Sequence, residues 1–92
     1  MDRVKLNNRR SNFEIIADML RLGEAGKTEI MYSANMSYFQ LQKYLNFMLQ
    51  LKLIDKVTVG NPTVTYRVTK KGFRLLRDID NITHILESGE KD

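Results

Sequence analysis

The chain has 92 residues, a net charge of +4 and no cysteine. A domain of this size buries roughly 60–65% of the surface that its unfolded chain exposes, so it gains stability from a partner subunit. Without cysteine there is no disulfide framework, no thiolate metal site and no thiol nucleophile, and a single histidine offers too few ligands for zinc.

Positive charge is concentrated in two segments. Residues 1–10, which lack apolar periodicity and are expected to form an arm, are net basic, as are residues 37–71. The segments 11–36 and 72–92 are net acidic. This asymmetry is typical of a nucleic-acid-binding protein, although a solvated basic surface is the simpler alternative. No stretch has the apolar run of a signal peptide or a membrane span, so we expect a soluble, cytoplasmic protein.

The first helix is predicted to begin at Ser11, which forms a Ser-x-x-Glu capping box with Glu14. Its apolar residues repeat with a helical period and are Phe13, Ile15, Ile16, Met19, Leu20 and Leu22. The segment 23–26, with a glycine at each end, is predicted to end this helix.

A second, shorter helix is predicted over about 28–34, with Thr28 as its N-cap, and a third follows at once. Asn35 tolerates the left-handed conformation that ends helices, and Ser37 forms another capping box with Gln40. Two helices joined by about three residues must cross steeply, which is how a helix-turn-helix is built. The second helix of such a pair fits the major groove of DNA.

The third helix, residues 38–51, has two distinct faces. The core side is predicted to carry Leu41, Leu45 and Met48, with Tyr44 and Leu49 at its borders. The opposite side carries Phe39, Lys43, Asn46 and Gln50, flanked by Gln40, Gln42 and Phe47. Asparagine and glutamine can form paired hydrogen bonds with adenine, and lysine can reach guanine or phosphate. The same residues would also suit a solvated helix that has no ligand.

The two phenylalanines of this helix leave further alternatives open. Phe39 could contact the methyl groups of thymine, or it could dock on the surface of another protein. Phe47 is expected to be partly buried under the hairpin that follows in the sequence.

Residues 53–59 and 63–68 are rich in β-branched side chains and alternate with period two, which predicts a two-stranded hairpin. The segment Gly60-Asn61-Pro62 forms its turn. One face is expected to carry Val57, Val59, Val64, Tyr66 and Val68, and the outer face Lys56, Thr58, Thr63, Thr65 and Arg67. Lys56 and Arg67 would then meet phosphates beside the groove.

Other basic residues are candidates for phosphate contacts. The hairpin turn has no Lys or Arg, so Arg9 and Arg10 of the arm would supply that charge or enter a minor groove, unless they are ordinary tail charges. Lys70 and Lys71 lie in the first turn of the last helix, where positive charge opposes the helix dipole. A phosphate nearby would explain this pair.

The last helix is predicted to follow Thr69, its N-cap, to run over about 70–88 and to stop at Gly89. Phe73 and Leu76 are expected to pack on the core. An apolar stripe with heptad spacing consists of Leu75, Ile79, Ile82 and Leu86. Together with Ile85, these residues are predicted to form a dimer interface. The chain has no later segment to cover the end of this stripe. Either a second copy covers it, or the helix bends back onto its own domain or frays.

Three helices, a hairpin and a last helix, in this order, are typical of a winged helix-turn-helix, an α+β and mainly helical fold. The predicted organisation is a basic arm (1–10), a winged helix-turn-helix domain with a two-stranded wing (11–72), a C-terminal dimerisation helix (73–88) and a tail (89–92).

Four runs of the sequence carry a resemblance to a known family. They are Arg-Ser-Asn-Phe-Glu-Ile-Ile at 10–16, Lys-Thr-Glu-Ile-Met-Tyr-Ser-Ala-Asn-Met-Ser-Tyr at 27–38, Leu-Ile at 53–54 and Tyr-Arg-Val-Thr-Lys-Lys-Gly at 66–72. The block at 27–38 is fairly specific, whereas the last is common to many winged helices. Together they resemble the small archaeal winged-helix DNA-binding proteins of the Sso-ten-a type.

This resemblance implies an archaeal source, a homodimer through the C-terminal helix, and binding of double-stranded DNA in a chromatin or regulatory role. Members of that family often have Lys or Arg where this chain has Phe39, Gln42 and Asn46. The departure implies a weaker grip on phosphates by this helix, or a grip moved to the arm. The last helix is also shorter than in members with a long coiled coil.

The sequence therefore predicts a dimeric, double-stranded DNA-binding transcriptional regulator that reads the major groove with helix 38–51. It predicts no cofactor, metal, small-molecule ligand or catalytic residue. The candidate DNA contacts are Arg9, Arg10, Ser37, Phe39, Gln40, Gln42, Lys43, Asn46, Gln50, Lys56, Arg67, Lys70 and Lys71. A protein-interaction module and a non-specific chromatin protein are the alternatives. An enzyme has little support, because the chain has no Gly-rich phosphate loop and no paired carboxylates in a defined site.

Overall fold

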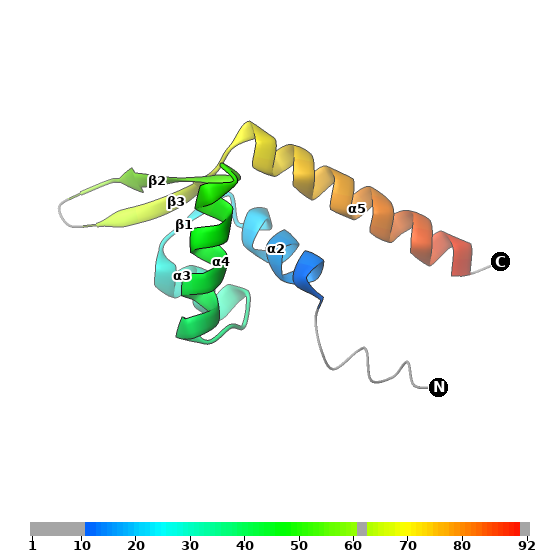
Figure 1. Cartoon of the computed structure of the whole chain (residues 1–92), viewed down its shortest axis with the longest axis horizontal. Helices are drawn as coiled ribbons and strands as arrows, with labels where there is room; N and C mark the ends of the chain where they lie inside the picture. The colour runs from blue at the N-terminus through cyan, green and yellow to red at the C-terminus, as the bar shows by residue number, and fades with distance from the viewer. Residues whose placement is uncertain (1–10, 61–62, 91–92) are drawn as a thin grey trace.

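The computed structural model describes residues 11–60 and 63–90, and Figure 1 shows the arrangement of its elements. In chain order these are α2 (Asn12–Arg21), β1 (Glu24–Ala25), α3 (Lys27–Ser33), α4 (Tyr38–Gln50), β2 (Ile54–Thr58), β3 (Val64–Val68) and α5 (Lys70–Glu90). The mainly helical winged-helix fold predicted from the sequence is confirmed. Within the described residues, no helix is both long and apolar enough to cross a membrane. The arm with Arg9 and Arg10 and the turn residues Asn61 and Pro62 lie outside the described residues.

The starts of the first two helices show one prediction confirmed and one corrected. Ser11 caps α2 as predicted, because its Oγ accepts from the Glu14 amide at 3.2 Å while Glu14 Oε1 accepts from the Ser11 amide at 2.9 Å. For α3, the N-cap is Gly26 rather than Thr28, and no side chain accepts a hydrogen bond there. Gly26 already has the extended backbone that an N-cap needs, so α3 begins one residue earlier than predicted.

The sheet has three antiparallel strands in the order β1-β3-β2, one strand more than the predicted hairpin. The extra strand β1 has only two residues and places Glu24 opposite Arg67 and Ala25 opposite Tyr66 on β3. It lies in the segment that the sequence assigned to the end of the first helix. The strand therefore fixes the connection between α2 and α3 against the wing.

The register of β2 and β3 corrects the predicted faces of the hairpin. Lys56 lies directly opposite Tyr66, and Val57 lies opposite Thr65. Directly opposed residues point to the same side of a sheet, so Val57 is not on the face of Tyr66. Lys56 and Arg67 consequently lie on opposite faces and not together on the outer one. This register points Ile54, Tyr66 and Val68 into the core. The burial of these three side chains favours this register over one shifted by a single residue.

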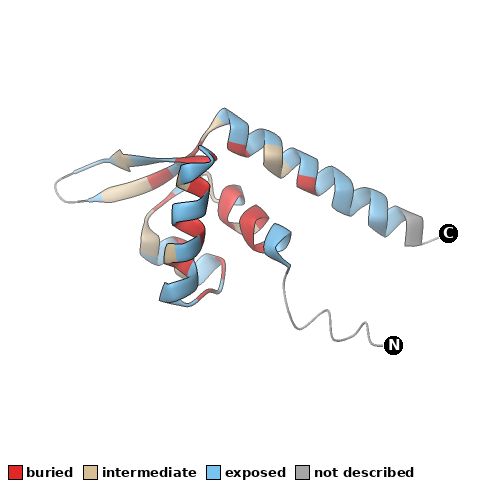
Figure 2. Cartoon of the chain, viewed as in Figure 1, coloured by how far each residue is buried: buried red, intermediate tan, exposed pale blue. Residues whose placement is uncertain are grey.

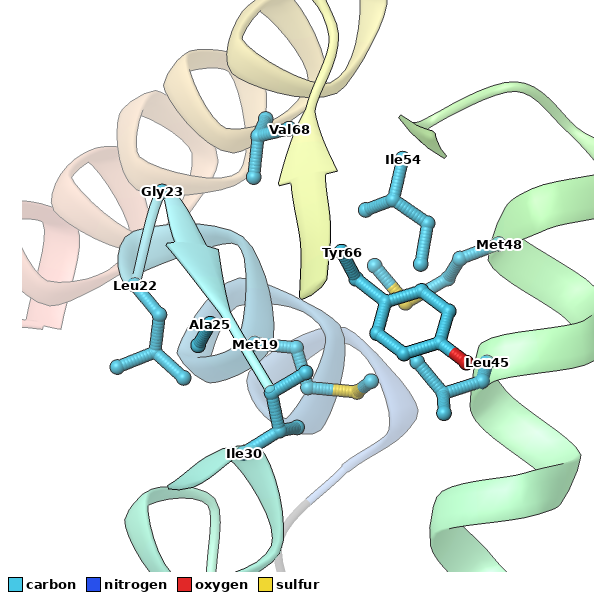
Figure 3. Close-up of a pocket in the computed structure, with 10 residues that line it drawn as sticks. All are labelled: Met19, Leu22, Gly23, Ala25, Ile30, Leu45, Met48, Ile54, Tyr66 and Val68. Atoms are coloured by element: carbon cyan, nitrogen blue, oxygen red, sulfur yellow. The ribbon is translucent and has the colours of Figure 1, made fainter. Parts of the chain in front are cut away.

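The core is formed by α2, α3, α4, the first half of α5 and the inner face of the sheet (Figure 2). Its largest fully buried side chains are Leu20, Leu41 and Met48. The ten residues drawn in Figure 3, Gly23 among them, line a remaining space. Its volume is only about 10 Å³, no more than one water needs, so this interior is filled. The prediction that Phe13 joins the buried stripe of α2 is wrong, because it lies in the first turn, beyond the core, with 66% of its surface exposed.

The last helix, α5, is continuous over 21 residues, about 31 Å, and runs beside α2 (Figure 1). Thr69 caps it as predicted, since its Oγ1 accepts from the backbone amide three residues on at 3.0 Å. Arg21 of α2 pairs with Asp80, with 3.0 Å between Nη1 and Oδ2. The helix continues through Gly89 to Glu90, so the prediction that Gly89 ends it is wrong. Phe73 is also exposed and does not pack on the core as expected, because it lies on the side of α5 away from the buried Ile79.

Candidate nucleic-acid interface

The turn between α3 and α4 is defined by the backbone at Asn35. Its φ of 52° lies in the left-handed region, as predicted. The Asn35 amide donates to the Tyr32 carbonyl at 3.2 Å, and the Met36 amide donates to the Met31 carbonyl at 3.0 Å. These two bonds form a Schellman motif, which pairs the last carbonyls of α3 and reverses the chain. The helix-turn-helix predicted from the sequence is present.

Ser37 begins α4 through the second predicted capping box. Its Oγ accepts from the Gln40 amide at 3.1 Å, and Gln40 Oε1 accepts from the Ser37 amide at 3.2 Å. Both residues were candidates for DNA contact, yet each side chain already has this partner within the helix. Their established contribution is to fix where α4 begins.

The direction of α4 is fixed by the side that faces the domain. Leu41, Leu45 and Met48 are buried as predicted, and Tyr44 at the border is buried too. Tyr44 Oη donates to Oδ1 of Asn12 at 2.6 Å, which ties the middle of α4 to the first turn of α2. The opposite side of α4 is therefore held toward solvent by a packed core and a hydrogen bond.

The exposed side of α4 carries one cation and no acidic residue. Its exposed members include Phe39, Lys43, Asn46, Phe47 and Gln50, all predicted for this side. Phe39 is 78% exposed, whereas Phe47 is 46% exposed and so is covered over about half of its surface. Gln42 is half-buried, and its Oε1 is buried with no hydrogen-bond partner in the described part of the chain. This face offers amides, an ammonium group and aromatic rings to a ligand.

Arg67 on β3 lies between two acidic residues of the neighbouring strands. It is directly opposite Glu24 on β1 and Asp55 on β2. Glu24 Oε2 also accepts a hydrogen bond from Thr65 Oγ1 at 2.7 Å, which holds this carboxylate at the sheet. The two carboxylates offset the charge of Arg67, so it is a weaker candidate for phosphate than Lys56, which is exposed opposite Tyr66.

Lys71 has a partner that the sequence did not reveal. Its Nζ donates to the carbonyl oxygen of Leu51, the C-cap of α4, at 2.8 Å. A cation at the C-terminal end of a helix is favourable, so this contact explains why a lysine is tolerated at the start of α5. Within the described part of the chain, Lys70 makes no such contact, so of the predicted pair it is the one that a phosphate would explain.

Two groups of candidate residues include members that were missed from the sequence. Arg74 and Arg77 were not predicted as contacts, yet they line a shallow pocket of about 340 Å³ on α5 together with Phe73 and the predicted Lys70. Their spacing of three, four and seven residues is the signal that could have identified this basic stripe. The Nζ of Lys27, the first residue of α3, lies 6.0 Å from the ring centre of Tyr38 at the start of α4. That contact joins the starts of two different helices, and no sequence period predicts it.

The predicted dimer stripe divides into a covered and an uncovered half. Ile79 is buried and Leu75 is half-buried within the chain's own core. Beyond them, Ile82, Ile85 and Leu86 are 58%, 65% and 64% exposed. The helix continues without a break to Glu90, so the alternative in which it bends back onto its own domain or frays before residue 88 does not occur. Between α5 and the first turn of α2 lies an apolar groove of about 360 Å³, lined by Phe13, Leu75, Ile79, Ile82 and Leu86.

Known proteins share this fold and part of this sequence. A family model described as winged helix-turn-helix matches residues 9–87. The uncharacterized protein MJ0287 of Methanocaldococcus jannaschii is 30% identical over 83 residues, which cover 87% of this chain and 80% of that protein. The match to the family model thus extends over almost all of the described residues.

Two solved structures illustrate the range of the likeness. Sso10a-2, a DNA-binding protein from Sulfolobus solfataricus, has a TM-score of 0.80 at 30% identity, over 89% of this chain and 87% of that one. The antimony-specific transcriptional repressor AntR has a TM-score of 0.65 at 16% identity, over 97% of this chain and 78% of its own. At that identity, the second likeness concerns the fold alone.

Proposed function

Since the chain belongs to the winged helix-turn-helix family, of the same type as Sso10a-2, we propose that it is a dimeric regulator that binds double-stranded DNA and reads the major groove with α4. The observation that carries the proposal is the exposed side of α4. It has no acidic residue to repel phosphates, and Lys43, Asn46 and Gln50 offer groups that pair with bases. The packed opposite side would hold the helix rigidly as it enters the groove.

Most phosphate contacts in this proposal come from outside α4, because Lys43 is its one basic residue. Lys56 on the wing and Lys70 at the start of α5 are exposed cations that would flank the groove. Arg9 and Arg10 are assigned the same role on sequence alone. Arg67 would contribute less, because Glu24 and Asp55 offset its charge.

We assign the uncovered end of α5 to contact with a second copy of this chain. Ile82, Ile85 and Leu86 are exposed on a helix that extends past the domain, and the groove beside Phe13 offers a place for apolar side chains of the partner. Each such side chain contributes roughly 1.5–3 kcal/mol when it is fully buried. A dimer would also present two copies of α4 to one duplex, so the affinities of both would combine.

A salt titration of binding to duplex DNA tests this proposal. With Lys43, Lys56 and Lys70 of two protomers on phosphates, the log–log slope of affinity against salt should be about −5, roughly −0.9 for each phosphate contact. With Arg9 and Arg10 of both protomers on phosphates as well, the slope should be about −9. A monomeric variant should show about half of that slope. An absence of binding to duplex DNA at low salt would refute the proposal, and capture of another protein through Phe39 would then favour an interaction module.

Selection of preferred sites from random duplex DNA separates a regulator from a chromatin protein. A regulator of this kind predicts a palindrome with half-sites about one helical turn apart, because the two copies of α4 are related by a two-fold axis. Recovery of no preferred sequence would favour non-specific binding in a chromatin role. The same selection with Lys43→Gln identifies the base pairs near that side chain.

A further inference from the structure

We propose that Phe39 determines sequence specificity by contacting the 5-methyl groups of thymine, so that the preferred sites are duplexes with thymine opposite the start of α4. This inference rests on the proposed function and names the chemical group that α4 reads. It starts from the exposure of Phe39, which at 78% is the most exposed large hydrophobic side chain among the described residues. Among residues 11–60 and 63–90, nothing covers more than a small part of the ring, although it stands on a rigidly packed helix.

The position of Phe39 places it where a reading helix meets the bases. It is the second residue of α4 and lies within the capping box that Ser37 forms with Gln40. In helix-turn-helix proteins, the N-terminal residues of the second helix contact base edges in the major groove. The Schellman motif at Asn35 and the capping box fix this end of the helix, so Phe39 is presented in one direction.

The surroundings of Phe39 favour a DNA base over a protein surface. Lys43 and Asn46 follow it by four and seven residues on the same side of α4, and both are exposed. Protein interfaces have an apolar centre from which charged residues are depleted. Here the apolar ring is next to an ammonium group and an amide, and α4 has no acidic residue. That mixture matches a groove edge where hydrogen-bonding groups alternate with an apolar one.

Only one base offers an apolar group in the major groove. The edge of thymine carries a 5-methyl group, whereas the other base edges present hydrogen-bond donors and acceptors. A phenylalanine ring that contacts this methyl removes apolar surface of both partners from water. Loss of one such methyl contact is expected to weaken binding about fourfold, and loss of one in each half-site about 15-fold.

The test compares two duplexes of alternating A·T base pairs, one with thymine and one with uracil in its place. Uracil pairs with adenine in the same way but has no methyl group. The full-length protein should bind the thymine duplex about fourfold to 15-fold more tightly, and Phe39→Ala should bind both duplexes equally. Phe39→Leu, which keeps an apolar side chain, should retain most of the preference. Phe47→Ala is the matched control and should keep it entirely.

The outcomes separate this inference from the proposed function. If the thymine preference persists in Phe39→Ala, it reflects the shape of the duplex and the inference is refuted, while DNA binding stands. If the unaltered protein binds both duplexes equally, the inference is also refuted. If it binds neither duplex at low salt, the proposed function itself fails. Because Phe39 is exposed, the unfolding midpoint of Phe39→Ala should match that of the unaltered protein, which excludes a folding defect.

Discussion

The ammonium group of Lys71 donates a hydrogen bond to the carbonyl oxygen of Leu51, with 2.8 Å between Nζ and oxygen. This contact joins the first turn of α5 to the C-terminal end of α4. Thr69 reinforces it, because its Oγ1 donates to the carbonyls of Lys52 at 2.7 Å and Leu53 at 3.1 Å. The helix that we propose reads DNA and the helix that we propose pairs two copies are therefore fastened to each other at their ends.

Replacing Lys71 by methionine should lower stability without changing how binding depends on salt. Methionine keeps an unbranched side chain but removes the charge at the end of α4, which should cost about 0.5–1 kcal/mol of unfolding free energy. Lys70→Met is the matched control and should leave stability within about 0.5 kcal/mol while it lowers the salt slope. Urea denaturation and salt titration measure the two effects. Equal behaviour of the two variants would contradict this division of roles.

Replacing Gly72 by alanine should destabilise the junction strongly. A Cβ at this position would overlap the carbonyl oxygen of Leu53 and come within 2.8 Å of Val68 Cγ1. The backbone of α5 would have to move, and we expect a loss of about 3 kcal/mol. Gly60→Ala is the control, because among the described residues its Cβ would meet only Thr63, at 3.7 Å. This change should alter stability by less than about 0.5 kcal/mol. Similar unfolding midpoints for both variants would show that the junction is not tightly packed.

Replacing Lys43 by glutamine should weaken DNA binding more than the same change at Arg67. Lys43 is the one cation of α4 and faces solvent, so its loss should reduce the magnitude of the salt slope by about 0.9 per protomer. Arg67 lies between Glu24 and Asp55, so its removal should change the slope less. Fluorescence anisotropy with a labelled duplex measures both. A larger effect at Arg67 would move the main contact from α4 to the wing.

Replacing Ile82 by aspartate should convert the dimer to monomers. The side chain lies on the uncovered stripe of α5, and a carboxylate there could not be buried against a second copy without a large desolvation penalty. His84→Asp is the control, since it places the same group on the opposite side of the helix. Sedimentation equilibrium distinguishes the two. A dimer that survives Ile82→Asp would exclude this stripe as the interface.

The local features of the fold could be predicted because neighbouring residues determine them. The capping boxes at Ser11 and Ser37, the left-handed turn at Asn35 and the cap at Thr69 each depend on side chains within three or four residues. The exposed side of α4 follows from the helical period in the same way. These features place the helix-turn-helix, and with it most of the candidate interface.

The features that depend on distant residues could not be predicted. Strand β1 has two residues, too short for any period, and exists because Glu24 and Ala25 pair with β3. The predicted hairpin faces were wrong by one residue, because alternation in the sequence does not reveal which strand residues are opposed. The two carboxylates beside Arg67 and the contact between Lys71 and Leu51 also depend on residues distant in the sequence. They make Arg67 and Lys71 weaker candidates for DNA contact than the sequence suggested.

Amide chemical shifts of the isotope-labelled protein, recorded during titration with duplex DNA, test the central proposal most directly. If α4 reads DNA, the largest changes should occur on its exposed side, at Phe39, Lys43 and Asn46, with smaller ones near Lys56. Changes confined to the basic stripe at Arg74 and Arg77, with α4 unaffected, would contradict the proposed reading helix. An absence of changes at low salt would contradict DNA binding altogether.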